Sequence, residues 1–253
     1  MIIDADCHIS SARHDELAIT GSELIDRMDV AGVDKAIVWL KPRYDKQIEP
    51  ENRAIYNVWK QYPDRLLPFG WANPHLGDQA TRDTIKRCFE DYGFRGIKFN
   101  GAQDGYVIDD ADFALPYIEA AAQYNQMIAF HIGADFYENT HPYRLGKIAA
   151  RFPETQFFMI HMGGAGTPPL SRSAIETAAQ HNNVSLIGSA IPFRLVLDAL
   201  KTLGPERMCF GSDTPFYLMH VSLAAYRALM QGEISDQGQA RVLGGNVARL
   251  LNL

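Results

Sequence analysis

The side chains best suited to chemistry lie at the ends of short apolar segments. The first apolar run of the chain is followed by Asp6 and His8, which are two positions apart. If this run is a strand, alternate residues point to the same side, which would place the carboxylate and the imidazole about 6 to 7 Å apart. Such a pair can close on a divalent cation, while Cys7 would point to the opposite face.

The same kind of ending recurs along the chain. Later apolar runs end in Lys98 and Asn100, in His131, in His161 and in Asp213. If the strands are parallel, these ends meet at one edge, where imidazoles and carboxylates would converge. Nitrogen and oxygen ligands without thiolate suit Zn²⁺, Mn²⁺ or Fe²⁺.

The elements that must position these residues alternate regularly. Strand-length apolar runs are each followed by a segment of helical period, and eight such units are present. The predicted strands are 2–5, 35–40, 66–71, 96–99, 127–131, 156–161, 184–188 and 207–210. The predicted helices are 22–31, 51–62, 79–92, 112–124, 143–151, 169–181, 193–203 and 222–230, with Ser22 and Asp112 as expected N-terminal caps.

This alternation predicts a parallel α/β fold. Continuously apolar strands such as 36–40 and 157–160 are typical of a parallel sheet covered on its outer face. Eight units in about 250 residues match a (β/α)8 TIM barrel, formed by one domain over 1–253 with a helical extension, 235–253, that closes one end. The alternative is an open doubly wound sheet, but no Gly-x-Gly-x-x-Gly follows the first strand.

The amino-acid composition indicates in which cell compartment the protein functions and which classes of partner it does not bind. The chain has 253 residues, of which 47% are hydrophobic and 21% charged, enough for a large core. A net charge of −6 without a dense basic cluster argues against nucleic-acid or anionic-membrane partners. Three scattered cysteines, no membrane-length apolar run and no secretory signal pattern predict a cytoplasmic protein.

Taken together, these motifs resemble the amidohydrolase superfamily, in the branch that contains aminocarboxymuconate semialdehyde decarboxylase. The resemblance spans nearly the whole chain and rests on residues 3–8, 96–99, 130–133, 160–164, 210–216 and 245–251. Its most specific pieces are His-Met-Gly-Gly at 161–164 and Gly-Ser-Asp-Thr-Pro-Phe at 211–216.

The resemblance implies one divalent metal ion, Zn or Mn, with His161 acting on the substrate. The implied ligands are Asp6, His8, His131 and Asp213. The family usually has His-x-His on its first strand, whereas this chain has Asp6 in the first of those places, as some decarboxylases of the branch have an acidic residue. The extra carboxylate favours a harder ion such as Mn²⁺.

Four residues are predicted to bind substrate: Lys98, Asn100, Arg144 and Arg194. For Lys98 the alternatives are pairing with an anionic substrate group, a structural role in the barrel mouth, or carboxylation to bridge two metals as in other amidohydrolase branches. The arginines could clamp a carboxylate or lie on the surface. Further rim positions that bear on specificity are Arg13, His14, Arg43, Trp71, Asn73 and Tyr137.

We therefore expect a metal-dependent hydrolase that opens a C–O or C–N bond, such as a lactone or amide, in a small organic substrate. Asp213 would be the general base for a metal-activated water, and His161 would polarise the carbonyl or shuttle a proton. The alternative is a non-oxidative decarboxylase of an aromatic or unsaturated acid, in which His161 or Asp213 protonates carbon. A second alternative is a barrel that binds a small molecule without catalysis. The resemblance also implies that such barrels often pair as homodimers.

Overall fold

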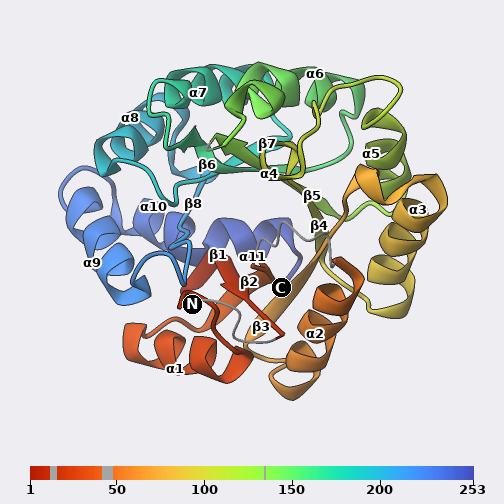
Figure 1. Ribbon diagram of the computed structural model, residues 1–253. Coiled ribbons are helices and arrows are strands. Elements are labelled where there is room, and N and C mark those ends of the chain that lie inside the picture. The colour runs from red at the N-terminus through yellow and green to blue at the C-terminus, as the bar shows by residue number, and fades with distance from the viewer. Residues whose placement is uncertain (12–15, 42–47, 134) are drawn as a thin grey trace.

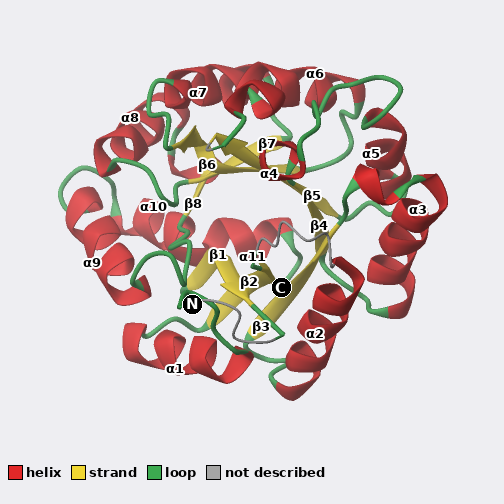
Figure 2. Ribbon diagram, in the orientation of Figure 1, coloured by secondary structure: helices red, strands yellow, loops and turns green. Residues whose placement is uncertain are grey.

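Eight parallel strands form one continuous sheet surrounded by helices (Figures 1 and 2). The computed structural model describes residues 1–11, 16–41, 48–133 and 135–253. The strands pair in chain order and are β1 Ile3–Ile9, β2 Lys35–Leu40, β3 Leu66–Trp71, β4 Gly96–Phe99, β5 Met127–Gly133, β6 Phe157–Ala165, β7 Val184–Ile187 and β8 Met208–Cys209.

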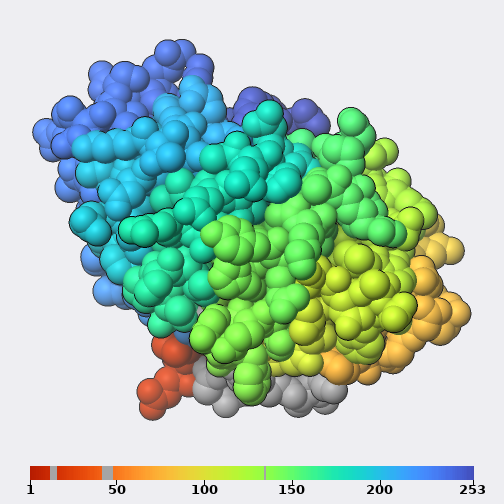
Figure 3. Space-filling model, turned by 90° about the horizontal axis from the view of Figure 1, so that it is seen from above, coloured from red at the N-terminus to blue at the C-terminus, as the bar shows by residue number. Residues whose placement is uncertain are grey.

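The helices alternate with the strands along the chain and form a ring outside the sheet. The longer ones are α1 Gly21–Ala31, α2 Ile48–Gln61, α3 Asp78–Lys86, α5 Leu115–Ala122, α6 Pro142–Arg151, α7 Leu170–Gln180, α8 Phe193–Leu203 and α9 Met219–Met230. The short ones are η1 Pro74–Leu76, η2 Arg87–Asp91, α4 Gly101–Asp104, η3 Tyr137–Thr140, η4 Pro205–Arg207, α10 Asp236–Ala240, η5 Arg241–Gly245 and α11 Asn246–Leu250. Figure 3 shows the molecule from above the view of Figure 1. On this side the side chains over α5 to α8 form a continuous surface.

The last strand returns to the first and closes the barrel. The Ala5 amide donates to the Phe210 carbonyl at 2.9 Å, and the His8 amide donates to the Thr214 carbonyl at 2.7 Å. Cys7 and Thr214 also form a parallel bridge. This closure confirms the predicted (β/α)8 barrel and excludes the open sheet.

The strands bury apolar side chains on both faces. One core cluster fills the barrel interior and includes Trp39, Phe69, Phe158 and Ile160. A larger cluster packs the outer faces of the strands against the helices. Burial on both faces explains why these strands read as continuous apolar runs in the sequence.

Strand β1 contributes to both clusters because its alternation is interrupted. Ile3 and Ala5 belong to the interior cluster, whereas Cys7 and Ile9 belong to the outer one. The pairing register with β2 shifts between Asp4 and Cys7, as in a β-bulge. Bulges re-aim side chains near functional sites. Here the irregularity turns the side of the strand that carries Asp6 and His8 toward the barrel mouth.

The C-terminal segment packs against the amino ends of the strands. Val247 and Leu251 join the interior cluster with Ile3. Asn246 Nδ2 donates to the carbonyls of Pro205 and Met208, at 2.6 and 2.7 Å. The predicted extension therefore contacts the barrel end opposite the predicted ligands.

Some element boundaries differ from the prediction. Helix α1 is capped by Thr20 rather than by Ser22, because Thr20 and Glu23 form a reciprocal capping box. The predicted helix 79–92 is divided at Arg87, where a π-helical turn begins. No described helix is long and apolar enough to cross a membrane.

Candidate metal centre

Four predicted residues converge at the carboxyl end of the barrel. His8 Nε2 lies 3.5 Å from Asp6 Oδ1 and 3.4 Å from Asp213 Oδ1. His161 Nδ1 lies 3.7 Å from Asp6 Oδ2. All four residues are buried. The side chains of β1, β6 and the segment after β8 thus meet although they are far apart in sequence.

The orientation of His8 is fixed by the backbone of β2. Its Nδ1 lies 2.7 Å from the Leu40 carbonyl oxygen, which can only accept a hydrogen bond. Nδ1 therefore carries the hydrogen, and Nε2 directs its lone pair toward Asp6 and Asp213. A histidine held in this way is prepared to bind a cation through Nε2.

Unusual backbone conformations place two of these residues. His161 has φ 63° and Asp213 has φ 60°, both in the left-handed region that non-glycine residues rarely adopt. Such conformations cluster at functional sites, where the surrounding structure supports their cost. Ser212, which precedes Asp213, is tied to β1 because its amide donates to Asp4 Oδ1 at 2.9 Å.

His131 lies against His161 at the end of β5. The two imidazole rings meet edge to face with centroids 4.7 Å apart. The His131 Nε2 atom is buried and has no hydrogen-bond partner among the described residues. Burial, followed by the charges of His161 and Lys98, holds the pKa of His131 well below its usual value. A neutral, unpartnered imidazole is the form that coordinates a metal.

Lys98 lies fully buried on β4 between two tryptophan rings. Its Nζ atom is 4.2 Å from the ring centroid of Trp39 and 5.0 Å from that of Trp71. Within the described parts of the chain, Nζ makes no hydrogen bond. Burial lowers the pKa of Lys98 to about 8, against the opposing attraction of Asp6 and Asp213. Lys98 is therefore a buried amine held mainly by aromatic faces.

Asp6 and His8, both on β1, each shift the pKa of the other. Burial alone would raise the pKa of Asp6, but the hydrogen bond with His8 and nearby cationic groups outweigh it and hold that pKa well below its usual value. Burial also opposes a charge on His8, yet the carboxylates of Asp213 and Asp6 raise its pKa. The negative charge that favours a proton on His8 would equally favour a cation.

These residues fit a divalent ion. One ligand atom from each of Asp6, His161 and Asp213 lies within 4.8 Å of the others. His8 Nε2 lies beside both carboxylates, and the unpartnered His131 Nε2 adjoins His161. The donor set is oxygen and nitrogen only, as Mn²⁺ and Zn²⁺ accept. The geometry brings His161 as close to the cluster as the implied ligands, so His161 is itself a candidate ligand.

A comparison of the sequence with models of protein families shows to which family the chain belongs. The model described as amidohydrolase matches residues 3–253. The chain belongs to the amidohydrolase family. A comparison with curated proteins gave no significant match.

Solved structures share the amidohydrolase's fold over its full length. The 2,6-dihydroxybenzoate decarboxylase from Rhizobium has a TM-score of 0.79 and 20% identity, covering 99% of this chain and 98% of that chain. A 5-carboxyvanillate decarboxylase from Sphingomonas paucimobilis has a TM-score of 0.77 and 17% identity, covering 100% and 99%. A dihydroxybenzoic acid decarboxylase from Polaromonas sp. JS666, with bound manganese and the inhibitor 2-nitroresorcinol, has a TM-score of 0.78 and 17% identity, covering 100% and 97%.

Of the other predicted substrate-binding residues of the amidohydrolase, Asn100 and Arg144 make structural contacts elsewhere. The Asn100 side chain accepts from the Gln103 amide at 3.1 Å and caps α4. Arg144 forms an ion pair with Asp109 at 2.6 Å. Arg194 lines a groove between α7 and α8. Substrate binding by these three residues stays a prediction, and the contacts of Asn100 and Arg144 account for the positions of those two side chains.

The remaining rim positions divide into two groups. Trp71 lies beside Lys98, Asn73 caps η1 through the His75 amide, and Tyr137 is exposed at η3. The predicted specificity positions Arg13, His14 and Arg43 lie outside the described residues.

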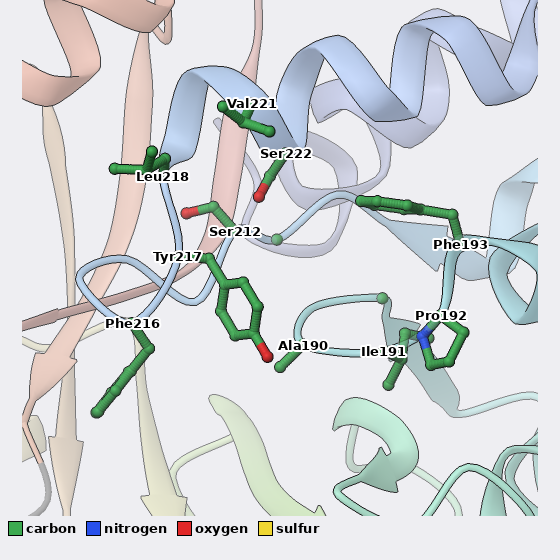
Figure 4. Close-up of a pocket in the computed structure, with 12 residues that line it drawn as sticks. Ala190, Ile191, Pro192, Phe193, Ser212, Phe216, Tyr217, Leu218, Val221 and Ser222 are labelled. Carbon is green, nitrogen blue, oxygen red and sulfur yellow. The ribbon is translucent and has the colours of Figure 1, made fainter.

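A pocket of about 580 Å³ lies beside the cluster of the amidohydrolase (Figure 4). Its walls are the segments after β7 and β8 and the start of α9. Phe216, which lines it, also meets the His8 ring edge to face at 5.6 Å. The lining residues are Gly188, Ala190, Ile191, Pro192, Phe193, Gly211, Ser212, Phe216, Tyr217, Leu218, Val221 and Ser222. None of them carries a charged side chain, so the pocket suits an uncharged or aromatic group.

Two contributors to the site were missed by the sequence analysis. Trp39 Nε1 lies 3.1 Å from both Asp6 Oδ1 and His8 Nε2. Ser189 contacts Asp6 and His161 through its hydroxyl. Trp39 lies in a strand whose sequence indicates only apolar core, and Ser189 has no charge or motif to mark it.

Proposed function

We propose that this amidohydrolase is a metal-dependent, non-oxidative decarboxylase of small aromatic or unsaturated carboxylic acids. The observation that carries the proposal is the cluster of carboxylates and imidazoles that fits a cation, with the buried Lys98 nearby and an uncharged pocket alongside. The similar solved structures are decarboxylases, one of them with bound manganese and a resorcinol inhibitor, and this favours decarboxylation over the hydrolysis that the sequence predicts.

The chemistry assigns a role to each group. Decarboxylation breaks the bond between the ring carbon and the carboxylate, leaves the electron pair on carbon and releases CO₂, so that carbon must receive a proton. A divalent cation held by Asp6, His8, His131 and Asp213 would supply Lewis-acid attraction to the substrate's oxygens. Lys98 would attract an anionic substrate group in this water-poor site.

His161 is suited to deliver the proton. Its Nδ1 lies 3.2 Å from the Ser189 carbonyl oxygen, which only accepts, so Nδ1 carries a hydrogen. The other nitrogen, Nε2, is then the atom that can accept a proton and return it, as histidine does in general acid–base catalysis. Asp213 is the second group within the cluster that can carry a proton.

The pocket would hold the body of the substrate. Ile191, Phe193 and Leu218 line it with apolar surface, and Tyr217 extends toward Ala190 across it (Figure 4). Pockets of several hundred Å³ with apolar walls and a few polar groups are typical of small-molecule sites. An aromatic ring in this pocket would leave its carboxylate free to face the cluster.

The test begins with metal content and ends with product analysis. Protein purified without chelator should contain about one equivalent of Mn or Zn per chain by elemental analysis. It should release CO₂ from a panel of hydroxybenzoates and unsaturated acids, and chelation should abolish that release until Mn²⁺ is restored. Opening of lactones or amides without CO₂ release would indicate a hydrolase instead. Absence of bound metal, even after Mn²⁺ or Zn²⁺ is added, would favour the non-catalytic binding barrel.

A further inference from the structure

Ser189, in the segment between β7 and α8, joins two parts of the candidate centre. Its hydroxyl oxygen lies 2.5 Å from Asp6 Oδ2 and 2.9 Å from His161 Nδ1. The side chain is 1% exposed, so water cannot readily replace either contact. One small side chain therefore links a candidate metal ligand with the candidate proton carrier.

The available hydrogens give this link a direction. An ionised Asp6 can only accept a hydrogen bond, so the single hydroxyl hydrogen of Ser189 points to Asp6. The hydroxyl oxygen is then free to accept from the N–H at His161 Nδ1, which it shares with the Ser189 carbonyl oxygen 3.2 Å from the same nitrogen. The resulting order runs from His161 through Ser189 to Asp6. It keeps the Nε2 lone pair of neutral His161 available to a cation or a substrate.

The segment that carries Ser189 is held firmly. The Tyr226 hydroxyl donates to the Gly188 carbonyl at 2.6 Å, and the Gly188 amide donates to the Cys209 carbonyl at 3.2 Å. A Cβ atom at position 188 would lie 2.1 Å from the Tyr226 oxygen, so only glycine fits without a shift. Ala190, on the other side, has φ 53°. This local structure places the Ser189 side chain between β1 and β6.

The second oxygen of Asp6 is also occupied. Trp39 Nε1 lies 3.1 Å from Asp6 Oδ1 and can donate to it. Asp6 is thus cradled by an indole N–H on one oxygen and a hydroxyl on the other. Both partners donate hydrogen bonds, and an ionised carboxylate can accept both of them. A neutral histidine in the same place could accept only one, because its second ring nitrogen carries a hydrogen.

We propose that Ser189 is a positioning residue whose hydroxyl orients Asp6 for metal binding and, together with the Ser189 carbonyl oxygen, holds His161 with its hydrogen on Nδ1. Hydrogen-bonded groups around metal ligands commonly change affinity by about 10- to 100-fold when they are removed. The proposal rests on the metal site proposed above, but it does not depend on which reaction the site catalyses.

The test compares Ser189→Ala with Ser189→Thr, which retains the hydroxyl. Mn²⁺ titration followed by electron paramagnetic resonance should show a Kd about 10-fold weaker in the alanine variant and near wild type in the threonine variant. In protein carrying ¹⁵N-histidine and diamagnetic Zn²⁺, the downfield Nδ1–H signal of His161 should move or broaden in the alanine variant only. The matched control is Ser185→Ala, which removes the hydroxyl of a different buried serine, one that lies on β7 itself.

Each outcome decides. A folded Ser189→Ala protein with wild-type Mn²⁺ affinity and an unchanged His161 signal would overturn the proposal. If the alanine variant does not fold by circular dichroism, a folded Ser189→Cys variant with wild-type affinity and signal would overturn it equally, because a thiol is a much weaker donor. Failure to detect CO₂ release would count against the proposed function alone, since neither readout uses a substrate.

Discussion

The two ends of the barrel are built from the same strands but differ in what they bury. At the amino end, Val247 and Leu251 from the C-terminal segment pack against Ile3 in an apolar cluster. At the carboxyl end, the same interior holds buried acids and imidazoles, two of them on left-handed backbone. One end contributes packing, while the other includes a costly backbone arrangement of the kind that clusters at functional sites.

The sharpest test of this contrast is Asp213→Asn at the carboxyl end. The amide nearly preserves the shape of the side chain but cannot exchange a proton, so turnover should fall at least about a hundredfold. Circular dichroism should show an unchanged fold. The exposed Asp91→Asn change is the matched control and should retain full turnover. Wild-type turnover of the Asp213 variant would remove that residue from the chemistry.

The opposite result is expected from Val247→Ala at the amino end. Val247 is fully buried, so removing two methyl groups should lower the free energy of unfolding by about 2 kcal/mol. Turnover per folded molecule should not change. Urea denaturation and steady-state kinetics check the two parts, with Val30→Ala, at a position 75% exposed, as the neutral control. A large loss of turnover without loss of stability would mean that the two ends are coupled.

The smallest effect is expected on the outer wall, at Asp109. Burial raises the pKa of Asp109, but hydrogen bonds from Arg144 and Lys147 outweigh it and hold the pKa below its usual value of 3.8. A depressed folded-state pKa gives stability that is present above 3.8 and is lost as the pH falls through the folded-state value. Asp109→Asn should therefore cost up to about 1 kcal/mol at pH 7 and progressively less in acid.

Urea denaturation of the Asp109 variant at pH 7 and at pH 3 measures that difference. Substrate affinity should stay at the wild-type level, because the ion pair with Asp109 accounts for the position of Arg144. A tenfold rise in KM would instead restore Arg144 to its predicted role in holding the substrate carboxylate.

Much of the fold could be predicted because its strands carry a strong local signal. A buried parallel strand must be apolar on both faces, so runs such as 35–40 and 66–71 are recognisable and match β2 and β3 in full. Helix ends carry a weaker signal, since caps depend on single residues. Thr20 and Glu23 have the spacing of a capping box, so the sequence contains the signal for the observed cap, although Ser22 was the predicted one.

The candidate site was partly predictable for the same reason. Asp6, His8 and His161 were marked by their places at strand ends, and the structure brings them together. Ser189 and Trp39 could not be found in that way. Their importance arises from contacts across 183 and 33 residues of sequence. Nothing local distinguishes them from any other serine or buried tryptophan.

The irregularity in β1 has a consequence for how this protein can change. It divides a seven-residue strand into two sections whose outward and inward positions are set independently. Substitutions at Ile3 or Ala5 can be selected for thermal resistance while the cation-facing section keeps its aim. Thermal stability and the geometry of the candidate site can therefore be changed by substitutions in separate halves of one strand.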